Sequence, residues 1–374
     1  MHWHGHIHAQ NVFIIGATGG VGGKVIEQIN RCDFWDSDHL HPTRILGVAN
    51  SKKILLADPN SVLQGLSWEQ SEDIKKDIDR MGVTIREGYW SILHSLKTLG
   101  LRESDIVFID TTADASKENL EFHKEVIRRG GVIVTANKNP IALSSVEEFR
   151  YLTRDRRKYA YRASVMAGGP AVNEIAGAYD TKNTVHSIEG CFSGTLAYIC
   201  TELEKSKKFS EIVKDAHSRK YTEPNPWDDL SGFDVAKKIL ILARTAGYDI
   251  SIEDIEIVPF ISQEYASYSG KTFFENIAHL DLDFSHRITR LKSEGKTLRY
   301  IASMKTKNQK ASIHVGPQEV SLESPLGSLT GTDNKVVIET DCFTSECARP
   351  GAGIENTANS IRVDLASLLK ERIV

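Results

Sequence analysis

The sequence predicts an α/β protein with two domains, the first of which binds a nucleotide. A short apolar strand near the start of the chain runs directly into a glycine-rich turn and a helix. Further apolar strands alternate with helices up to about residue 160, and polar residues follow their last positions. From residue 161 the pattern changes, and later strands alternate or run apolar, as in a mixed sheet. The expected architecture is a Rossmann-type nucleotide-binding domain followed by an α+β substrate and dimerisation domain.

The glycine-rich turn has the setting of a dinucleotide site. A strand expected over residues 11–15 leads into Gly-x-x-Gly-x-x-Gly at residues 16–22, and a helix is predicted over residues 21–30. Glycines allow a tight turn and close approach of the backbone to a pyrophosphate, which binds at the helix N-terminus. A glycine turn without a ligand is the alternative. The residues expected to contact the cofactor are Gly16, Thr18, Gly19, Gly20, Val21 and Gly22.

The second strand, over residues 44–49, indicates which cofactor is used. NAD-selective domains place an acid after this strand, whereas small or basic residues accommodate the 2′-phosphate of NADP. Here Asn50, Ser51 and Lys52 follow, and the segment contains no acid. The sequence therefore favours NADP, with NAD as the alternative, although exposed lysines after a strand are also common without any function.

Two more strands, over residues 106–110 and 132–135, end in residues suited to a ligand site. Ligands of an open parallel sheet lie beyond the carboxyl ends of its strands. Thr111 and Thr112 follow the first of these strands, and Asn137 and Lys138 follow the second. We expect all four at the cofactor edge; a solvated loop lysine is the other interpretation of Lys138.

In the second half we expect a strand over residues 161–165, a glycine turn, and a helix through Val172 and Ala178. A strand over residues 184–192 and a helix from Ser193 come next. Strands over residues 298–304, 311–315 and 336–340 complete a sheet that is covered by helices on one side. The other side of this sheet would be available to a second copy of the chain.

The run from Tyr221 to Lys238 carries the most chemical information. Pro224 and Pro226 predict a rigid loop, and Ser231 is a candidate cap for a helix that begins near residue 232. Asp234 and Lys238 are four residues apart on that helix and share one face. Such a pair, taken alone, is usually a solvated salt bridge.

Composition limits the remaining choices. The chain has 374 residues, a formal net charge of −4, 40% hydrophobic residues and 26% charged residues, as in ordinary globular proteins. We expect no general nucleic-acid binding, no membrane span and no metal site. Five scattered cysteines favour a reducing, cytoplasmic location. The first eight residues place histidine at every second position; a metal-binding head is conceivable, and a flexible extension or remnant is the simpler interpretation.

The Tyr221–Lys238 run resembles the signature of homoserine dehydrogenases, and the likeness extends from about Val12 to Leu369. The resemblance implies NAD(P)H-dependent reduction of L-aspartate 4-semialdehyde to L-homoserine, in the pathway to threonine, methionine and isoleucine. It also implies a short monofunctional form, without an aspartokinase or regulatory domain, that forms a homodimer. The residues to which it gives roles are Lys238 as proton donor, Asp234 as its partner, and Glu223, Asp229 and Lys138 as substrate ligands.

The resemblance adds two further expectations. The run at residues 349–353 resembles a segment that returns to the nucleotide domain and brings Gly353 near the cofactor; a plain helix start is the alternative. Many members bind a monovalent cation through a glutamate, but Arg162 stands at that place, and a guanidinium cannot ligate a metal. The expected division is an extension (1–10), a dinucleotide-binding domain (11–160), a catalytic and dimerisation domain (161–345) and a returning segment (346–374).

Two other functions would account for part of the sequence. Aspartate semialdehyde dehydrogenase shares the glycine loop but needs a cysteine nucleophile, for which Cys191 and Cys200 lack a nearby base in the sequence. A nucleotide-binding sensor without activity would not need Glu223, Asp234 and Lys238 together. In the favoured chemistry a lysine ammonium stabilises the alkoxide left by hydride addition and then protonates it, so that no catalytic metal is required.

Overall fold

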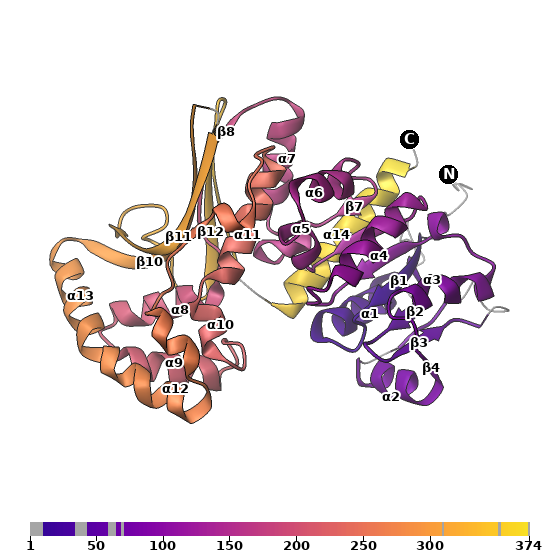
Figure 1. Ribbon diagram of the computed structural model, residues 1–374, viewed down its shortest axis with the longest axis horizontal. Helices are drawn as coiled ribbons and strands as arrows, with labels where there is room; N and C mark the ends of the chain where they lie inside the picture. Colours follow the sequence, from indigo (N-terminus) through magenta and orange to yellow (C-terminus); the bar gives the residue numbers. More distant parts are fainter. Residues whose placement is uncertain are drawn as a thin grey trace, which may run out of the picture. The chain divides into compact units, whose positions relative to one another are not determined.

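The computed structural model describes residues 10–33, 43–58, 65–68, 71–308, 310–350 and 353–372. The chain divides into two compact units, of which unit 1 is Met1–Ser164 with Gly353–Val374 and unit 2 is Val165–Ala352 (Figure 1). The division therefore falls slightly later than residues 160 and 345, where the sequence suggested it. The histidine-rich extension lies outside the described residues, except for Gln10.

Unit 1 is built on a seven-stranded sheet in the order β4-β3-β2-β1-β5-β6-β7. Strands β2, β1, β5, β6 and β7 are parallel, and β3 and β4 add an antiparallel edge. The strands are β1 (Gln10–Ile15), β2 (Thr43–Ala49), β3 (Lys53–Leu56), β4 (Val83–Thr84), β5 (Val107–Asp110), β6 (Val132–Thr135) and β7 (Tyr159–Ala160). The helices are α1 (Gly20–Asp33), α2 (Ser71–Met81), α3 (Trp90–Leu96), α4 (Lys117–Arg128), α5 (Asn139–Ala142), α6 (Val146–Thr153) and α14 (Ile354–Arg372).

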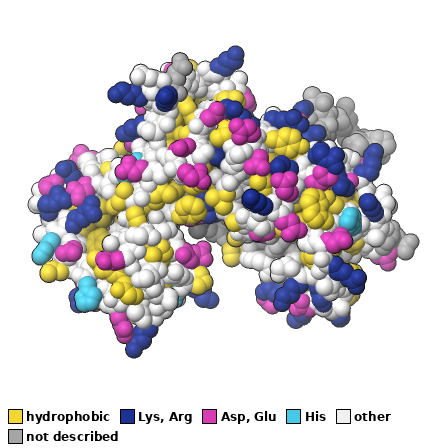
Figure 2. Space-filling model, viewed as in Figure 1, with side chains coloured by type: hydrophobic (Ala, Val, Ile, Leu, Met, Phe, Trp, Pro, Cys, Tyr) yellow, Lys and Arg dark blue, Asp and Glu magenta, His cyan; other side chains and the backbone are white. Residues whose placement is uncertain are grey.

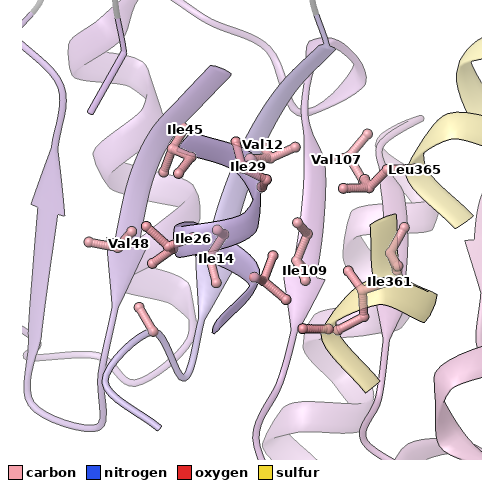
Figure 3. Close-up of a cluster of buried hydrophobic side chains, with 14 of the residues drawn as sticks. Val12, Ile14, Ile26, Ile29, Ile45, Val48, Val107, Ile109, Ile361 and Leu365 are labelled. Carbon is pink, nitrogen blue, oxygen red and sulfur yellow. The ribbon is translucent and has the colours of Figure 1, made fainter. Parts of the chain in front are cut away.

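The core of unit 1 joins residues from both ends of the sequence. The parallel strands β5 and β6 are buried along their whole length, as expected for parallel strands covered on both faces. Figure 3 shows Ile361 and Leu365 of α14 beside Val107 and Ile109 of β5, and all four belong to one buried cluster. Helix α14 is thus an integral part of the nucleotide-binding fold.

Unit 2 contains a six-stranded mixed sheet in the order β13-β12-β8-β10-β11-β9, in which only the β11–β9 pair is parallel. The strands are β8 (Val185–Cys191), β9 (Glu256–Ile257), β10 (Lys296–Lys307), β11 (Lys310–Ser321), β12 (Asp333–Thr340) and β13 (Thr344–Pro350). The helices are α7 (Ala171–Asp180), α8 (Gly194–Glu204), α9 (Phe209–Ser218), α10 (Pro226–Leu230), α11 (Phe233–Thr245), α12 (Gly270–Asn276) and α13 (Asp281–Ser293).

The strand expected over residues 161–165 is wrong. The chain there forms two 3₁₀ turns, Arg162–Ser164 and Met166–Gly168, directly after the short strand β7. None of residues 161–165 lies in a strand, and the left-handed backbone of Met166 and Ala167, with φ of 52° and 48°, forms the second turn just after this stretch. Apolar residues in this stretch are buried in turns, and periodicity does not distinguish that from a short strand.

Charged side chains of both signs are interspersed over the face shown in Figure 2. No helix in the described part of the chain is long and apolar enough to cross a lipid bilayer.

Candidate active site

The segment before α11 differs from the predicted rigid loop. Residues Pro226–Leu230 form the short helix α10, with Asn225 as its N-cap and Pro226 in its first turn. A proline fits there because the first amide of a helix has no partner within the helix. Ser231 lies one residue before the N-cap position of α11, which is Gly232 with φ of 76°, but its hydroxyl accepts the predicted kind of hydrogen bond, at 3.3 Å, from the amide of Phe233, the first residue of the helix. A Cβ atom on Gly232 would collide with the hydroxyl of Tyr300, so both conformation and space require glycine.

Asp234 and Lys238 lie on one face of α11, as predicted. The Lys238 Nζ atom is 2.9 Å from Asp234 Oδ2 and donates a hydrogen bond of 2.6 Å to the carbonyl oxygen of Phe192. The side chain of Lys238 is only 12% exposed, whereas that of Asp234 is 43% exposed. The ammonium group is therefore fixed in direction and largely shielded from solvent.

The acids of the preceding segment are brought together too. The backbone amide of Glu223 donates to Asp229 Oδ2 at 2.7 Å, while the Glu223 side chain is exposed. Burial raises the pKa of Asp229 to about 6, and the nearby carboxylates of Glu223 and Asp234 act in the same direction. Hydrogen bonding with the Glu223 amide and with the Thr195 hydroxyl offsets only part of this effect.

Thr195 was not predicted as a site residue. Ser193 caps α8 by accepting a hydrogen bond from the amide of Leu196, and this places Thr195 in the first helical turn. Its hydroxyl contacts the carbonyl oxygen of Tyr221 and Asp229 Oδ1. The Ser-Gly-Thr run after a strand was visible in the sequence, but its contact with Asp229 spans 34 positions and could not be seen there.

In unit 1 the predicted cofactor residues converge at the carboxyl end of β1 and β5. Gly16 has φ of 82°, and a Cβ atom on it would lie 2.8 Å from Thr111 Oγ1. A Cβ on Gly22 would collide with the carbonyl oxygen of Gly16. Thr111 in turn donates to the carbonyl oxygen of Ile15 at 2.7 Å. Packing around the turn is therefore so tight that only glycine fits at these two positions, of which Gly16 lies just before α1 and Gly22 in its first turn.

A buried carboxylate that the sequence analysis missed organises this edge. Asp110 ends β5 and is fully buried. It accepts hydrogen bonds from the Thr112 amide (2.8 Å), the Asn137 side chain (3.2 Å) and the Asn119 side chain (3.3 Å), and contacts His123 Nε2 at 3.1 Å. Burial opposes ionisation of Asp110, but these hydrogen bonds hold its pKa below the usual value. Asp110 thereby joins two predicted cofactor residues, Thr112 and Asn137.

His123 connects Asp110 to Tyr159 through its two ring nitrogens. An ionised Asp110 only accepts, so Nε2 of His123 donates to it, and Nδ1 of His123 contacts the hydroxyl of Tyr159 at 2.9 Å. Asn119 and His123 are four residues apart on α4 and face the sheet together. The spacing of Asn119 and His123, together with an acid at the end of a strand, is the pattern in the sequence that could have indicated their contact with Asp110.

The turn after β2 uses its predicted residues in different ways. The Asn50 side chain accepts hydrogen bonds of 2.8 Å from the amides of both Lys52 and Lys53, so it shapes the turn. Ser51 and Lys52 are exposed. Asn50 is therefore a structural residue of the turn, and Ser51 and Lys52 present the polar surface.

The remaining predicted residues also belong to unit 1. Lys138 is half-buried at the N-terminus of α5. Thr18 and Val21 are half-buried in the glycine turn, and Gly19 and Gly20 are exposed. A Cβ on Gly20 would lie 2.7 Å from Ile354 Cδ1, so this glycine also admits α14, whose first residue follows Gly353.

Arg162 occupies the place where the resemblance suggested a cation-binding glutamate. Its Nε atom lies 3.1 Å from Asp364 Oδ1 of α14, and the two side chains are 19% and 6% exposed. Burial raises the pKa of Asp364 to about 6, against the opposing influence of Arg162. Among the described residues no group of three or more His, Cys, Asp or Glu side chains is placed to hold a metal ion.

Neither candidate thiol nucleophile has the required environment. Burial raises the pKa of both Cys191 and Cys200 to about 12. A thiol must ionise to act as a nucleophile, so buried thiols of this kind are inert. Neither Cys191 nor Cys200 therefore offers the nucleophile that acyl-enzyme chemistry needs.

Comparison with known proteins agrees with this geometry. The family model described as homoserine dehydrogenase matches residues 170–366. A bifunctional aspartokinase/homoserine dehydrogenase 2 from Zea mays is 28% identical over 365 residues, which are 96% of this chain and 38% of that protein. The chain spans less than half of the length of the curated relatives it matches.

Two solved structures extend the comparison over the whole fold. A putative homoserine dehydrogenase from Archaeoglobus fulgidus is 25% identical with a TM-score of 0.74, covering 96% of this chain and 99% of that one. A hyperthermophilic archaeal homoserine dehydrogenase, solved in complex with NADPH, has the same fold at 18% identity, with a TM-score of 0.70 and coverage of 97% and 98%. The sequence match, which includes α10, α11 and their acids and lysine, shows that this chain belongs to the homoserine dehydrogenase family.

Proposed function

We propose that this protein reduces L-aspartate 4-semialdehyde to L-homoserine with NADPH, and catalyses the reverse oxidation, in the pathway to threonine, methionine and isoleucine. The observation that carries the proposal is the placement of Lys238. An ammonium has three N–H donors, and Asp234 and the carbonyl oxygen of Phe192 occupy two of them. The third is left for the oxygen of a substrate.

Lys238 would act on the oxygen of the aldehyde. Its remaining N–H stabilises the negative charge that develops on this oxygen and then supplies the proton that completes the alcohol. Asp234 orients the ammonium group of Lys238, because the ion pair holds the Nζ atom in place. Both functions depend on the ion pair of 2.9 Å.

The substrate is also an amino acid, whose ammonium group suits carboxylates. Glu223 and Asp229 provide them within one segment, linked by the hydrogen bond from the Glu223 amide. Lys138 is proposed to bind the substrate carboxylate or the reacting oxygen, as the family resemblance suggests. These roles give the site its preference for a substrate with charges of both signs.

The residues of unit 1 fit a dinucleotide. Because Gly16 and Gly22 have no side chains, a ligand can approach the backbone closely at the start of the 14-residue helix α1, whose N-terminus suits a pyrophosphate. Thr111, Thr112 and Asn137 line the same sheet edge, and Ser51 with Lys52 suits a 2′-phosphate. When bound, NADPH supplies the hydride. The NADPH complex of the hyperthermophilic relative supports this choice, with NAD as the alternative.

We further propose that the protein works in the cytoplasm as a homodimer formed through unit 2. Support for the dimer comes from one row across the sheet of unit 2, in which Lys305, Ser187 and Glu339 are neighbours. Ser187 donates to Glu339 at 3.0 Å, and Lys305 and Glu339 are exposed, so this part of the sheet face is accessible. Light scattering of the purified protein tests the dimer; a monomer at micromolar concentration contradicts it.

No metal is assigned. The guanidinium of Arg162 faces Asp364 and cannot ligate a cation. Activity should therefore be independent of Na⁺ and K⁺ at constant ionic strength. A steep rise with either ion contradicts this assignment.

One assay tests the main proposal. NADPH is incubated with L-aspartate 4-semialdehyde and protein, the loss of NADPH absorbance is followed, and the product is identified by chromatography. L-Homoserine as product supports the proposal. Absence of turnover favours a sensor. In a second mixture, with NADP⁺ and phosphate in place of NADPH, phosphate-dependent reduction of NADP⁺ by the semialdehyde indicates the acyl-transfer enzyme instead.

A further inference from the structure

The hydroxyl of Thr195 lies between two oxygen atoms. It is 2.5 Å from the carbonyl oxygen of Tyr221 and 3.0 Å from Asp229 Oδ1. Thr195 is buried, with 8% of its surface exposed, and α8 holds it in place through the Ser193 cap. All three groups are in unit 2, so their contact is a property of that unit alone.

The Thr195 hydroxyl has a single hydrogen and cannot donate it to both of these oxygen atoms. A hydroxyl has one hydrogen to donate, and a backbone carbonyl can only accept. The shorter contact requires the Thr195 hydrogen to point at the Tyr221 carbonyl. Two oxygens, Thr195 Oγ1 and Asp229 Oδ1, then face each other at hydrogen-bond distance, and only a hydrogen on Asp229 can join them.

We propose that at mildly acidic pH Asp229 is protonated in the substrate-free protein, donates this hydrogen to Thr195, and releases the proton when the ammonium group of an amino-acid substrate binds. The inference rests on the proposed function for the identity of the ligand. The other carboxyl oxygen, Oδ2, is already engaged by the Glu223 amide, so a proton on Oδ1 leaves both oxygens of the group satisfied.

The charges around Asp229 agree with a neutral carboxyl. Glu223 from the preceding loop and Asp234 from α11 both oppose a further negative charge, and burial acts in the same direction. On its own helix the nearest acid is Asp228, which is exposed. Lys238 on α11 pairs with Asp234 and the Phe192 carbonyl, and on α8 Tyr198 bonds Asp215.

Within the described residues no Lys, Arg or His side chain forms an ion pair with Asp229. A bound ammonium would therefore be the first cation to reach it. An opposite charge within hydrogen-bond reach favours the ionised form of a carboxyl group. Substrate binding and proton release then become a single linked event, and ligand affinity rises with pH up to about the free pKa and levels off above it.

The test is a calorimetric titration of L-homoserine into protein saturated with NADPH, a pair that cannot react. Titrations in buffers of different ionisation enthalpy count the protons released on binding. At about pH 5.5 we expect roughly 0.7 proton released per site, and near zero at about pH 8, given a free pKa of about 6. Binding without release at the lower pH overturns the inference.

Two variants and a second measurement locate the proton. Asp228→Asn, on the same helix, should leave proton release unchanged, whereas Asp229→Asn should abolish it. Release that persists in Asp229→Asn overturns the assignment. The infrared difference between free wild-type protein and free Asp229→Asn at about pH 5.5, in which the contribution of Asp364 cancels, should show a protonated carboxyl band that is lost on adding L-homoserine to the wild type.

The outcome separates this inference from the proposed function. Turnover of L-homoserine together with binding that releases no proton leaves the function standing and rejects the protonated Asp229. A protein that neither binds L-homoserine nor oxidises NADPH rejects both.

Discussion

Asp234 and Lys238 form an ion pair of 2.9 Å within a single turn of α11, so one short stretch of helix carries both the proposed proton donor and the residue proposed to orient it. The neighbouring Lys237 is 4.0 Å from the same carboxylate and lies over the ring of Phe233. The two lysines are adjacent in sequence but have different surroundings, which makes them a natural experimental pair.

Replacing Lys238 by alanine should lower kcat by about 10² or more, because the alkoxide loses both a charged donor and a proton source. The KM for NADPH should stay nearly the same. Steady-state kinetics with L-aspartate 4-semialdehyde measure both. Lys237→Ala is the control and should retain most of the turnover; a Lys238→Ala enzyme that does the same removes Lys238 from the chemistry.

Lys52→Ala should raise the KM for NADPH about tenfold, the loss expected for one charged hydrogen bond to a phosphate, and leave the KM for NADH unchanged. Lys53→Ala is a matched control, because the Lys53 ammonium bonds the backbone of Asp79. An enzyme that prefers NADH before any substitution contradicts the role given to Lys52.

Asp110→Asn should destabilise unit 1 by about 3–5 kcal/mol, since an amide in this place turns a donor towards Asn119 or Asn137. It should also raise the KM for the cofactor more than it lowers kcat, because Thr112 and Asn137 lose their common anchor. Thermal melts and kinetics check the two effects. Glu121→Gln on the exposed side of α4 should change neither, and an unchanged cofactor KM in Asp110→Asn limits Asp110 to stability.

The buried pair of Arg162 and Asp364 predicts a dependence of stability on pH. The folded pKa of Asp364 is about 6, above its ordinary value of 3.8, so the folded state holds this proton more tightly than the unfolded state. Its contribution is therefore greatest at low pH and is lost as pH rises from about 4 to about 6, by roughly 2 kcal/mol. Asp364→Asn lacks this change.

The measurement compares wild type and Asp364→Asn in urea unfolding at about pH 4.5 and about pH 7.5. The wild type should lose stability relative to the variant as pH rises. Asp79→Asn, an exposed change in the same unit, serves as control. A difference in unfolding free energy between wild type and Asp364→Asn that stays constant with pH, or that changes in the opposite sense, contradicts the raised pKa of Asp364.

Arg299→Met should destabilise unit 2 by about 3–5 kcal/mol. Arg299 is 1% exposed and donates to the carbonyl oxygens of Leu326 (3.2 Å), Gly327 (2.6 Å) and Leu329 (2.7 Å), which would lose their partner. Arg290→Met removes a surface pair with Glu319 and should cost less than about 1 kcal/mol. Equal melting temperatures for the two variants contradict the special role of Arg299.

Local signals in the sequence predicted much of the fold. The strand, glycine turn and helix of β1 and α1 appear where the pattern placed them, and β6 spans the predicted residues 132–135. Asp234 and Lys238 were predictable as a pair because helical spacing alone brings positions four apart together. These features depend on residues that are close in sequence.

Features set by distant contacts were missed. The sequence around Asp110 does not reveal its hydrogen-bond partners, because Asn137 and His123 belong to other elements of the fold. Gly232 ends one helix and starts another where a strand residue, Tyr300, leaves no room for a side chain. Such contacts depend on the folded arrangement and leave no periodic pattern.

The place of α14 in the core of unit 1 has a consequence for how the chain folds as it is made. Residues Ala358, Ile361, Leu365 and Leu368 complete a cluster whose other members are synthesised before all of unit 2. Unit 2 is one continuous segment and can fold as soon as it has left the ribosome. The core of the nucleotide-binding unit, in contrast, stays incomplete until its last helix, α14, has been synthesised. During synthesis, the first half of the chain is therefore the last to be finished, and it is the half that a chaperone would have to shield.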